Sequence, residues 1–262
     1  MSSNNDLFRD RLRRGDTLVG SFVKTPTLHA TEILAQVGYD FVVIDAEHAP
    51  LDRSHIDVML YAARAGGIAG LVRVPAISDI LSALDCGAVG VLVPHVDSPE
   101  RAREAAAASR YRNGRRGYSG ATRSSNYGGG SVWSNVDAQD AQTTVIAMIE
   151  DPQAVEQIEA IAAVDGIDAF FIGRGDLTVA YGAGRADDPV IVDAVRRISD
   201  AGRAAGKAVV VMVNGPEEAA GFEAMGASAF IVSTDQGLLR RAATAALAGL
   251  KALSPVRRPG VP

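Results

Sequence analysis

Short runs of apolar, often β-branched residues recur along the chain, and each is followed by a longer amphipathic stretch. The runs are bounded by Gly, Pro or Asp and are almost entirely apolar, which is typical of parallel strands covered on both faces. The pattern predicts eight strands, at 17–23, 41–45, 70–74, 90–94, 143–150, 168–173, 208–213 and 229–233. The predicted helices span 27–37, 54–66, 78–86, 98–109, 152–163, 188–205, 216–225 and 235–250.

Strict alternation of strand and helix, repeated eight times, predicts an α/β fold and within it a single closed (β/α)8 TIM barrel. An open dinucleotide-binding sheet is disfavoured, because the first strand runs into Ser21 to Pro26 and not into a G-x-G-x-x-G turn. We expect the barrel to occupy residues 1–250, beginning with a short polar arm or helix over 1–15. The Pro-rich end, 251–262, is expected to be a flexible tail.

One segment, 110–142, interrupts this rhythm. It is rich in Gly, Ser, Asn and Arg and has no apolar period. It follows the fourth predicted helix and precedes the fifth strand. A connection of this length is usually a functional flap, a partner-binding element or a disordered segment, and we expect a flap.

Composition narrows the class of protein. The 262 residues are 47% hydrophobic and carry a formal net charge of −5, with no basic block, which argues against nucleic acid as a partner. The single cysteine, Cys86, excludes a disulfide framework and a cysteine-based metal site. No stretch approaches the ~18 consecutive apolar residues of a membrane span. We therefore expect a cytoplasmic protein without a membrane partner.

Charged residues stand where predicted strands end, which is where TIM barrels build their active sites. The fifth strand ends at Glu150, and the sixth is followed by Asp176. Neighbouring strands lie ~4.8 Å apart, so the two carboxylates can converge on one point. An all-oxygen pair suits a hard divalent ion such as Mg²⁺ or Mn²⁺. The alternative, in which both residues only begin the helices that follow them, stays open.

Three further features face the same predicted mouth. Arg73, within the third strand, is suited to stabilising an oxyanion or to an ion pair with Asp45. His48, just beyond the second strand, is a candidate general base, with His95 a weaker second candidate. The turn Gly173-Arg174-Gly175 can offer backbone N–H groups to an anion, or it is a plain tight turn.

Lysine usage bears on the mechanism, because an imine requires a lysine that projects into the barrel. The three lysines are Lys24, Lys207 and Lys251, and of these Lys24 alone ends a predicted strand. The sequence therefore favours a metal electrophile over imine chemistry.

Several short blocks, in order and on the expected strands, carry a family resemblance. They are FVVIDAEHAP (41–50), VRVP (72–75), VLVP (91–94), IE (149–150) and FIGRGDL (171–177). With these blocks the chain resembles the HpcH/HpaI aldolase family, the metal-dependent class II pyruvate aldolases, across most of its length.

The resemblance implies roles for individual residues. Glu150 and Asp176 match metal ligands, for Mg²⁺ or Mn²⁺ in the first place and Co²⁺ or Zn²⁺ as further candidates. His48 matches the base and Arg73 the arginine that stabilises the enolate. Asp45 matches an acidic residue of the active site, and Asp85 matches the acidic residue that increases the basicity of the histidine. The backbone of Gly173 to Gly175 matches the turn that receives the pyruvate carboxylate. It also implies a homo-oligomer, a trimer or a hexamer with exchanged C-terminal helices.

Two departures from the family pattern matter. Met148 stands where the family often has a glutamine, which removes a hydrogen-bond partner for the substrate. The segment from Arg73 to Asp85 is slightly shorter than in the best-known members, which weakens the assignment of Asp85.

The predicted activity is reversible, metal-dependent aldol cleavage of a 4-hydroxy-2-oxo acid to pyruvate and an aldehyde, such as a semialdehyde. Arg116 and Arg123 in the 110–142 segment are candidates to pair with a distal carboxylate, or belong to a solvated basic loop. Two alternatives stay open: a citramalyl- or malyl-CoA-type lyase, and a non-catalytic barrel used as a binding protein.

Overall fold

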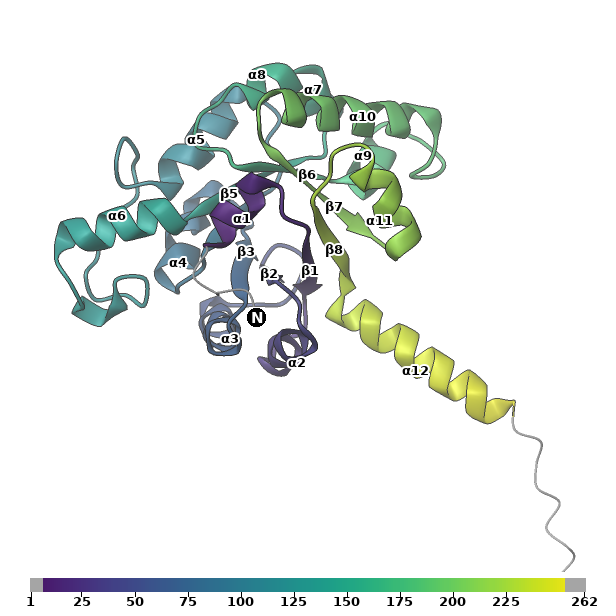
Figure 1. The fold of residues 1–262 in the computed structure, drawn as a ribbon, viewed down its shortest axis with the longest axis horizontal. Coiled ribbons are helices and arrows are strands. Elements are labelled where there is room, and N and C mark those ends of the chain that lie inside the picture. The colour runs from purple at the N-terminus through teal and green to yellow at the C-terminus, as the bar shows by residue number, and fades with distance from the viewer. Residues whose placement is uncertain (1–6, 253–262) are drawn as a thin grey trace, which may run out of the picture.

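Eight parallel strands close into a barrel in chain order, β1-β2-β3-β4-β5-β6-β7-β8, as the alternation predicts (Figure 1). The computed structural model describes residues 7–252. The strands are β1 Leu18–Val23, β2 Phe41–Asp45, β3 Ala69–Arg73, β4 Gly90–Val93, β5 Thr144–Ile149, β6 Ala169–Ile172, β7 Ala208–Val213 and β8 Ala229–Thr234. The predicted TIM barrel is confirmed.

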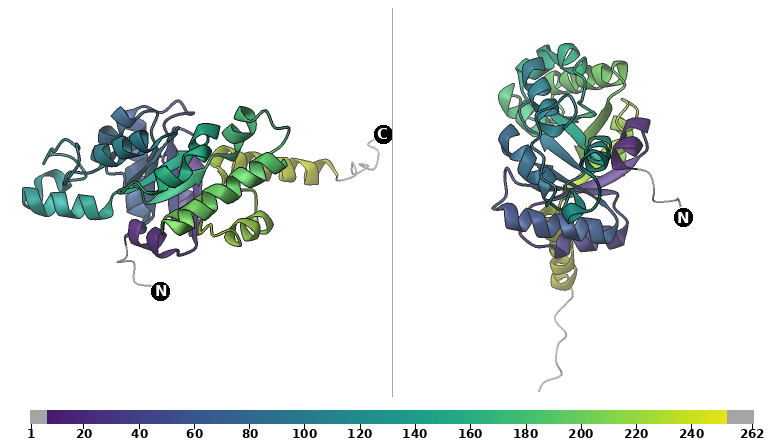
Figure 2. Two further views of the ribbon diagram at one scale, coloured as in Figure 1. Left: turned by 90° about the horizontal axis from the view of Figure 1, so that it is seen from above. Right: turned by 90° about the vertical axis from the view of Figure 1, so that its left-hand side faces the viewer.

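Helices cover the outside of the barrel (Figure 2). They are α2 His29–Val37, α3 Arg53–Gly66, α4 Ile80–Asp85, α5 Pro99–Ser109, α7 Pro152–Glu156, α8 Ile158–Ala162, α9 Arg174–Ala180, α10 Pro189–Ala204 and α11 Pro216–Glu223, with a 3-10 turn, η1 Ile77–Asp79, before α4. The helix predicted over 152–163 is two short helices that meet at Gln157. The sequence pattern missed α9, because Leu177 is its only buried residue.

Side chains alternate between the inside and the outside of the barrel along each strand. Inward positions such as Phe22, Val43 and Leu71 form one apolar cluster, while outward positions such as Val42 and Val72 pack against the helices. Both faces are therefore buried, which explains the uninterrupted apolar runs in the sequence. The same alternation directs the charged residues at the strand ends inward, above the apolar interior.

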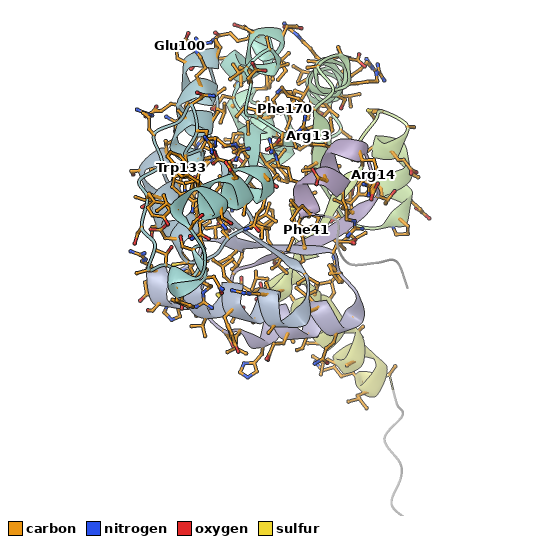
Figure 3. All side chains as sticks on the ribbon, turned by 60° about the vertical axis from the view of Figure 1, so that its left-hand side comes forward. Arg13, Arg14, Phe41, Glu100, Trp133 and Phe170 are labelled. Carbon is orange, nitrogen blue, oxygen red and sulfur yellow. The ribbon has the colours of Figure 1, made fainter. Side chains whose placement is uncertain are left out.

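The helix α1, Phe8–Arg14, closes the N-terminal end of the barrel. Its Leu12 is fully buried in the interior cluster, and the ring of Phe8 lies 5.3 Å from that of Phe41. Figure 3 shows Phe41 beside this purple helix. An ion pair of 2.8 Å between Arg9 Nε and Asp168 Oδ1 ties the helix to the start of β6. The arm predicted over 1–15 is thus a packed helix from Phe8 onward, and residues 1–6 lie outside the described part.

The 110–142 segment is not a flap over the mouth of its own barrel. It contains a 3-10 turn, η2 Asn126–Gly128, and a helix, α6 Val132–Gln142, that projects from the body (Figures 1 and 2). It joins the end of α5 to the start of β5, so it lies toward the opposite end of the barrel. The Tyr111 amide donates to Asp140 within the segment, at 2.9 Å.

The last helix, α12 Asp235–Lys251, extends away from the barrel (Figure 1). Its first turn is fixed, because the Asp235 carboxylate accepts hydrogen bonds from the backbone amides of Lys24 and Thr25. None of its residues is buried. Most of the predicted tail, 253–262, lies outside the described residues. No helix within 7–252 has the length and apolar character needed to cross a membrane.

Candidate active site at the C-terminal mouth of the barrel

A cavity of about 410 Å³ opens at the C-terminal ends of the strands, within the ~300–1,000 Å³ usual for small-molecule sites. Its floor is apolar and its wall carries both signs of charge. The lining residues are Phe22, Lys24, Asp45, Arg73, Met148, Phe171, Ile172, Gly173, Arg174, Gly175, Asp176, Ala186, Met212, Asn214 and Thr234.

Arg73 and Asp45 form a buried, two-pronged ion pair on one wall. They face each other in the register of β2 and β3, with Nε to Oδ1 at 2.9 Å and Nη2 to Oδ2 at 2.6 Å. Burial acts to raise the pKa of Asp45, but the hydrogen bonds and charge of Arg73 outweigh it and hold that pKa below its usual value. The ion pair weighed in the sequence analysis is therefore present, and the guanidinium also lines the cavity over the Phe22 ring, 4.9 Å from its centre.

Lys24 adds a second cation to this wall. Its Nζ lies 3.2 Å from Asp45 Oδ2, and the side chain is 24% exposed. The carboxylate of Asp45 is thus shared between two cations.

Two carboxylates stand on the other side of the cavity, where Asp176 lines it and Glu150 lies buried just behind. Glu150 is 3% exposed, and burial, together with the nearby charges of Asp176 and Glu47, raises the pKa of Glu150 to about 7. Gly173 permits this arrangement, because a β carbon there would come within 2.5 Å of the Glu150 β carbon.

A divalent cation fits this donor set, since it would neutralise two oxygen ligands that repel each other. Within residues 7–252, no three or more His, Cys, Asp and Glu side chains converge as a preformed cage. Glu150 and Asp176 would therefore leave most coordination positions to water and substrate, as catalytic Mg²⁺ sites often do.

His95 has a closer connection to this wall than its sequence position indicates. Its backbone adopts a left-handed conformation (φ 51°), and its N–H donates to Glu150 Oε1 at 2.7 Å. The ring Nδ1 lies 3.1 Å from Asp151 Oδ2. Burial lowers the pKa of His95, but Asp151 and Glu150 raise it more, so the net shift is upward. The sequence feature that pointed to His95 as a site residue was its position just beyond the end of β4.

His48 lies at the rim and does not line the cavity. Its backbone N–H donates to Asp45 Oδ1 at 3.1 Å, which fixes the turn after β2. Its side chain is 58% exposed, and its Nε2 lies 3.6 Å from Glu47 Oε2. Glu47, which the sequence analysis did not consider as a site residue, also lies 3.5 Å from Arg73 Nε.

The Gly173-Arg174-Gly175 turn borders the cavity, but the guanidinium of Arg174 is turned aside. It donates to the Met212 carbonyl and to Glu218, both at 2.7 Å, and lies over the Phe222 ring. The backbone of this turn is therefore the part left for a ligand.

Within one chain, Asp85, Arg116 and Arg123 do not reach the mouth of the barrel, so a role for them at an active site stays a prediction that requires a neighbouring subunit. Arg116 is fully buried 3.7 Å from Asp85, and Arg123 pairs with Asp57 of α3 at 2.6 Å. These groups lie between the 110–142 segment and the outer helices. The reason is topological, because the segment enters β5 from the end opposite the active site.

The sequence matches the HpcH/HpaI aldolase/citrate lyase family over residues 18–242. The chain belongs to this family. Its relatives include a 5-keto-4-deoxy-D-glucarate aldolase from Shigella dysenteriae, 32% identical over 247 residues, covering 91% of this chain and 96% of the relative. A hydroxypyruvate/pyruvate aldolase from Roseobacter denitrificans is 36% identical over 208 residues, covering 76% and 80%.

A crystal structure of an HpcH/HpaI aldolase/citrate lyase family protein from Burkholderia cenocepacia has the same fold. It superposes with a TM-score of 0.88 at 31% identity and covers 93% of this chain and 98% of its own. The family resemblance and the enzyme class, a carbon–carbon lyase, are confirmed.

Proposed function

We propose that this family member catalyses reversible, metal-dependent aldol cleavage of a 4-hydroxy-2-oxo acid to pyruvate and an aldehyde. The observation that carries the proposal is the buried Glu150 carboxylate near Asp176, which lines the same cavity as the Arg73–Asp45 pair. One wall thus suits a divalent cation and the other suits a developing negative charge. The aldolase names of the relatives support the same chemistry.

In this proposal Glu150 and Asp176 hold the divalent ion, Mg²⁺ or Mn²⁺, with Co²⁺ or Zn²⁺ as alternatives. When bound, the ion supplies Lewis acidity at the 2-oxo group of the substrate. The backbone of Gly173 to Gly175 faces the carboxylate of the same 2-oxo acid. The buried position of Glu150 orients its carboxylate before any ligand arrives, because the His95 amide already holds one oxygen.

The chain's own side chains would carry the bond-breaking step. His48 takes the proton of the C4 hydroxyl, the C3–C4 bond breaks, and its electron pair passes into the enolate of pyruvate while the aldehyde departs. Arg73 donates hydrogen bonds toward the enolate oxygen, and Asp45 keeps the guanidinium in place for this. A proton returned to C3 completes pyruvate.

Asp85 enters this proposal only as a group supplied by a neighbouring subunit. Within one chain it lies beside Arg116 and not at His48. We propose a homo-oligomer, a trimer or a hexamer, and the absence of buried residues on α12 supports a role for this helix in assembly. A cytoplasmic location is part of the same proposal.

The test is a pyruvate-release assay on a panel of 4-hydroxy-2-oxo acids, with and without chelator. We expect turnover to stop on chelation, to return with Mg²⁺ or Mn²⁺, and to be lost in Glu150→Gln and Asp176→Asn. Asp193→Asn, which removes a carboxylate from an exposed pair with Arg196, is the matched control. Pyruvate formation that survives complete metal removal would contradict the proposal, and cleavage of acyl-CoA substrates alone would favour the CoA-dependent lyase.

A further inference from the structure

The ammonium of Lys24 lines the cavity at the mouth and keeps hydrogen-bond donors that no described residue uses. Arg73 is bound by both prongs to Asp45, and Arg174 is held by Met212 and Glu218. An ammonium group has three N–H donors. Among the described residues the ammonium of Lys24 makes one polar contact, the 3.2 Å approach to Asp45. Donors of Lys24 therefore remain available to a ligand.

The position of Lys24 in the barrel indicates which end of a substrate it can contact. In a closed barrel of eight strands in chain order, β1 lies across from β5, so Lys24 lies across the cavity from the end of β5, beyond which Glu150 stands. The floor between them is formed by Phe22, Met148 and Phe171, all buried. A substrate whose 2-oxo acid end lies at Glu150 would therefore extend its other end over an apolar floor toward Lys24.

The charged groups around Lys24 limit the chemistry of the group that fits there. Lys24 and Arg73 contribute two positive charges, and Asp45 and Glu47 contribute two negative charges, so the spare donors of the Lys24 ammonium, and not a net charge, favour an anionic group here. A singly charged carboxylate fits better than a dianion such as a phosphate, which Asp45 would repel more strongly. The apolar floor strengthens such an interaction by lowering the local dielectric.

We propose that Lys24 is a specificity-determining residue that binds a carboxylate on the aldehyde half of the substrate. The inference rests on the proposed aldol function, since it concerns the part of the substrate that leaves as aldehyde. It gives this role to a residue of the same chain, in place of Arg116 and Arg123, whose side chains are engaged elsewhere.

The test compares two acceptor aldehydes of equal carbon number in condensation with pyruvate, glyoxylate with a carboxylate and glycolaldehyde without. In Lys24→Met we expect kcat/KM for glyoxylate to fall about 10- to 100-fold, mainly through KM, the loss expected for one charge-assisted hydrogen bond. With glycolaldehyde the change should stay within about threefold. Lys24→Arg should recover part of the preference for glyoxylate.

Two controls separate this role from others. Arg103→Met removes an exposed positive charge on α5 and should leave the preference between the aldehydes unchanged. Exchange of the pyruvate methyl protons for deuterium, followed by NMR with Mg²⁺ present, measures enolisation without any aldehyde. This exchange should be retained in Lys24→Met.

Each other outcome has a definite meaning. Equal losses with both aldehydes, with exchange retained, would overturn the specificity role and leave the proposed function standing. A wild-type enzyme that shows neither exchange nor condensation would refute the proposed function, and the inference with it. A borohydride-reduced pyruvate adduct on Lys24 would make it an imine-forming residue and also overturn the inference.

Discussion

Gly173 lies so close to Glu150 that a β carbon on Gly173 would be 2.5 Å from the Glu150 β carbon and 3.0 Å from its Oε2. The backbone conformation of Gly173 (φ −81°) is open to any residue, so space and not torsion restricts this position. The turn after β6 therefore fixes where the Glu150 carboxylate lies.

Replacing Gly173 with Ala should displace Glu150 and weaken divalent-ion binding about 5- to 150-fold, because overpacking costs about 1–3 kcal/mol. Isothermal titration with Mn²⁺ measures the change. Gly221→Ala, in α11 with nothing within 4 Å of the new β carbon, is the control and should bind Mn²⁺ as wild type does. An unchanged affinity in Gly173→Ala would mean that Glu150 is not a ligand.

Arg73→Ala should lower kcat about 10²- to 10³-fold with little change in KM, since it removes a donor needed when negative charge develops. Arg73→Lys keeps the charge but loses the two-pronged geometry, so it should recover little of kcat. Steady-state kinetics of pyruvate release provide both values. Turnover retained in Arg73→Ala would leave Arg73 with only its structural pair to Asp45.

The metal-free protein should lose stability as the pH rises from about 5 to about 7.5. The pKa of Glu150 in the folded chain is about 7, above its ordinary value of 4.5, so between these values the folded state keeps a proton that the unfolded state has lost. This proton stabilises the fold below the window, and its contribution disappears as the pH passes 7.

Urea unfolding of wild type and Glu150→Gln across this pH range isolates the effect. The unfolding free energy of wild type should fall relative to that of Glu150→Gln as the pH rises, because the glutamine does not titrate. A saturating divalent ion should reverse the trend for wild type, since it replaces the proton. A difference that does not vary with pH would refute the shifted pKa.

Asp168→Asn should lower the free energy of unfolding by about 3 kcal/mol, because it leaves two partly buried guanidinium groups without their carboxylate. The carboxylate of Asp168 bonds to Arg9 at 2.8 Å, to Arg110 at 3.3 Å and to the Val145 amide at 3.0 Å. Mn²⁺ affinity should not change, because the network lies at the closed end of the barrel. Asp200→Asn, in an exposed pair, is the control and should cost at most about 0.5 kcal/mol.

Light scattering should give the wild-type chain the mass of an oligomer. Glutamate in place of both Leu239 and Leu247, which are 71% and 53% exposed on α12, should shift the mass toward smaller species. The control is Val37→Glu on α2, an equally exposed apolar position. A monomeric wild type would rule out assembly through α12.

The strands were predictable to within a residue or so at each end, because burial on both faces leaves an unbroken apolar run. Helices with few buried residues were harder. α6 buries only Val136 and Gln139, and α9 only Leu177, so neither leaves a period in the sequence.

The residues of the candidate site also fall into those that the sequence indicated and those that it did not. Asp45, Arg73, Glu150 and Asp176 could be proposed from the sequence because each ends or follows a strand, and strand ends share one mouth. Arg116 and Arg123 lie away from the mouth of their own barrel, which the sequence did not indicate, because composition alone does not show which end of a barrel an insertion occupies. The role of His95 depends on a left-handed backbone that turns its amide toward Glu150, and this has no counterpart in the pattern.

Because α1 packs against the N-terminal end of the barrel, ligands reach the described cavity from its C-terminal mouth. Under the proposed function the 2-oxo acid lies deepest, against Glu150 and Asp176, and the aldehyde lies between it and solvent. Ligands would then have to come and go in a fixed sequence, with pyruvate the first to enter for synthesis and the last to leave after cleavage. Product-inhibition patterns of an ordered mechanism would be the kinetic signature of this closed end.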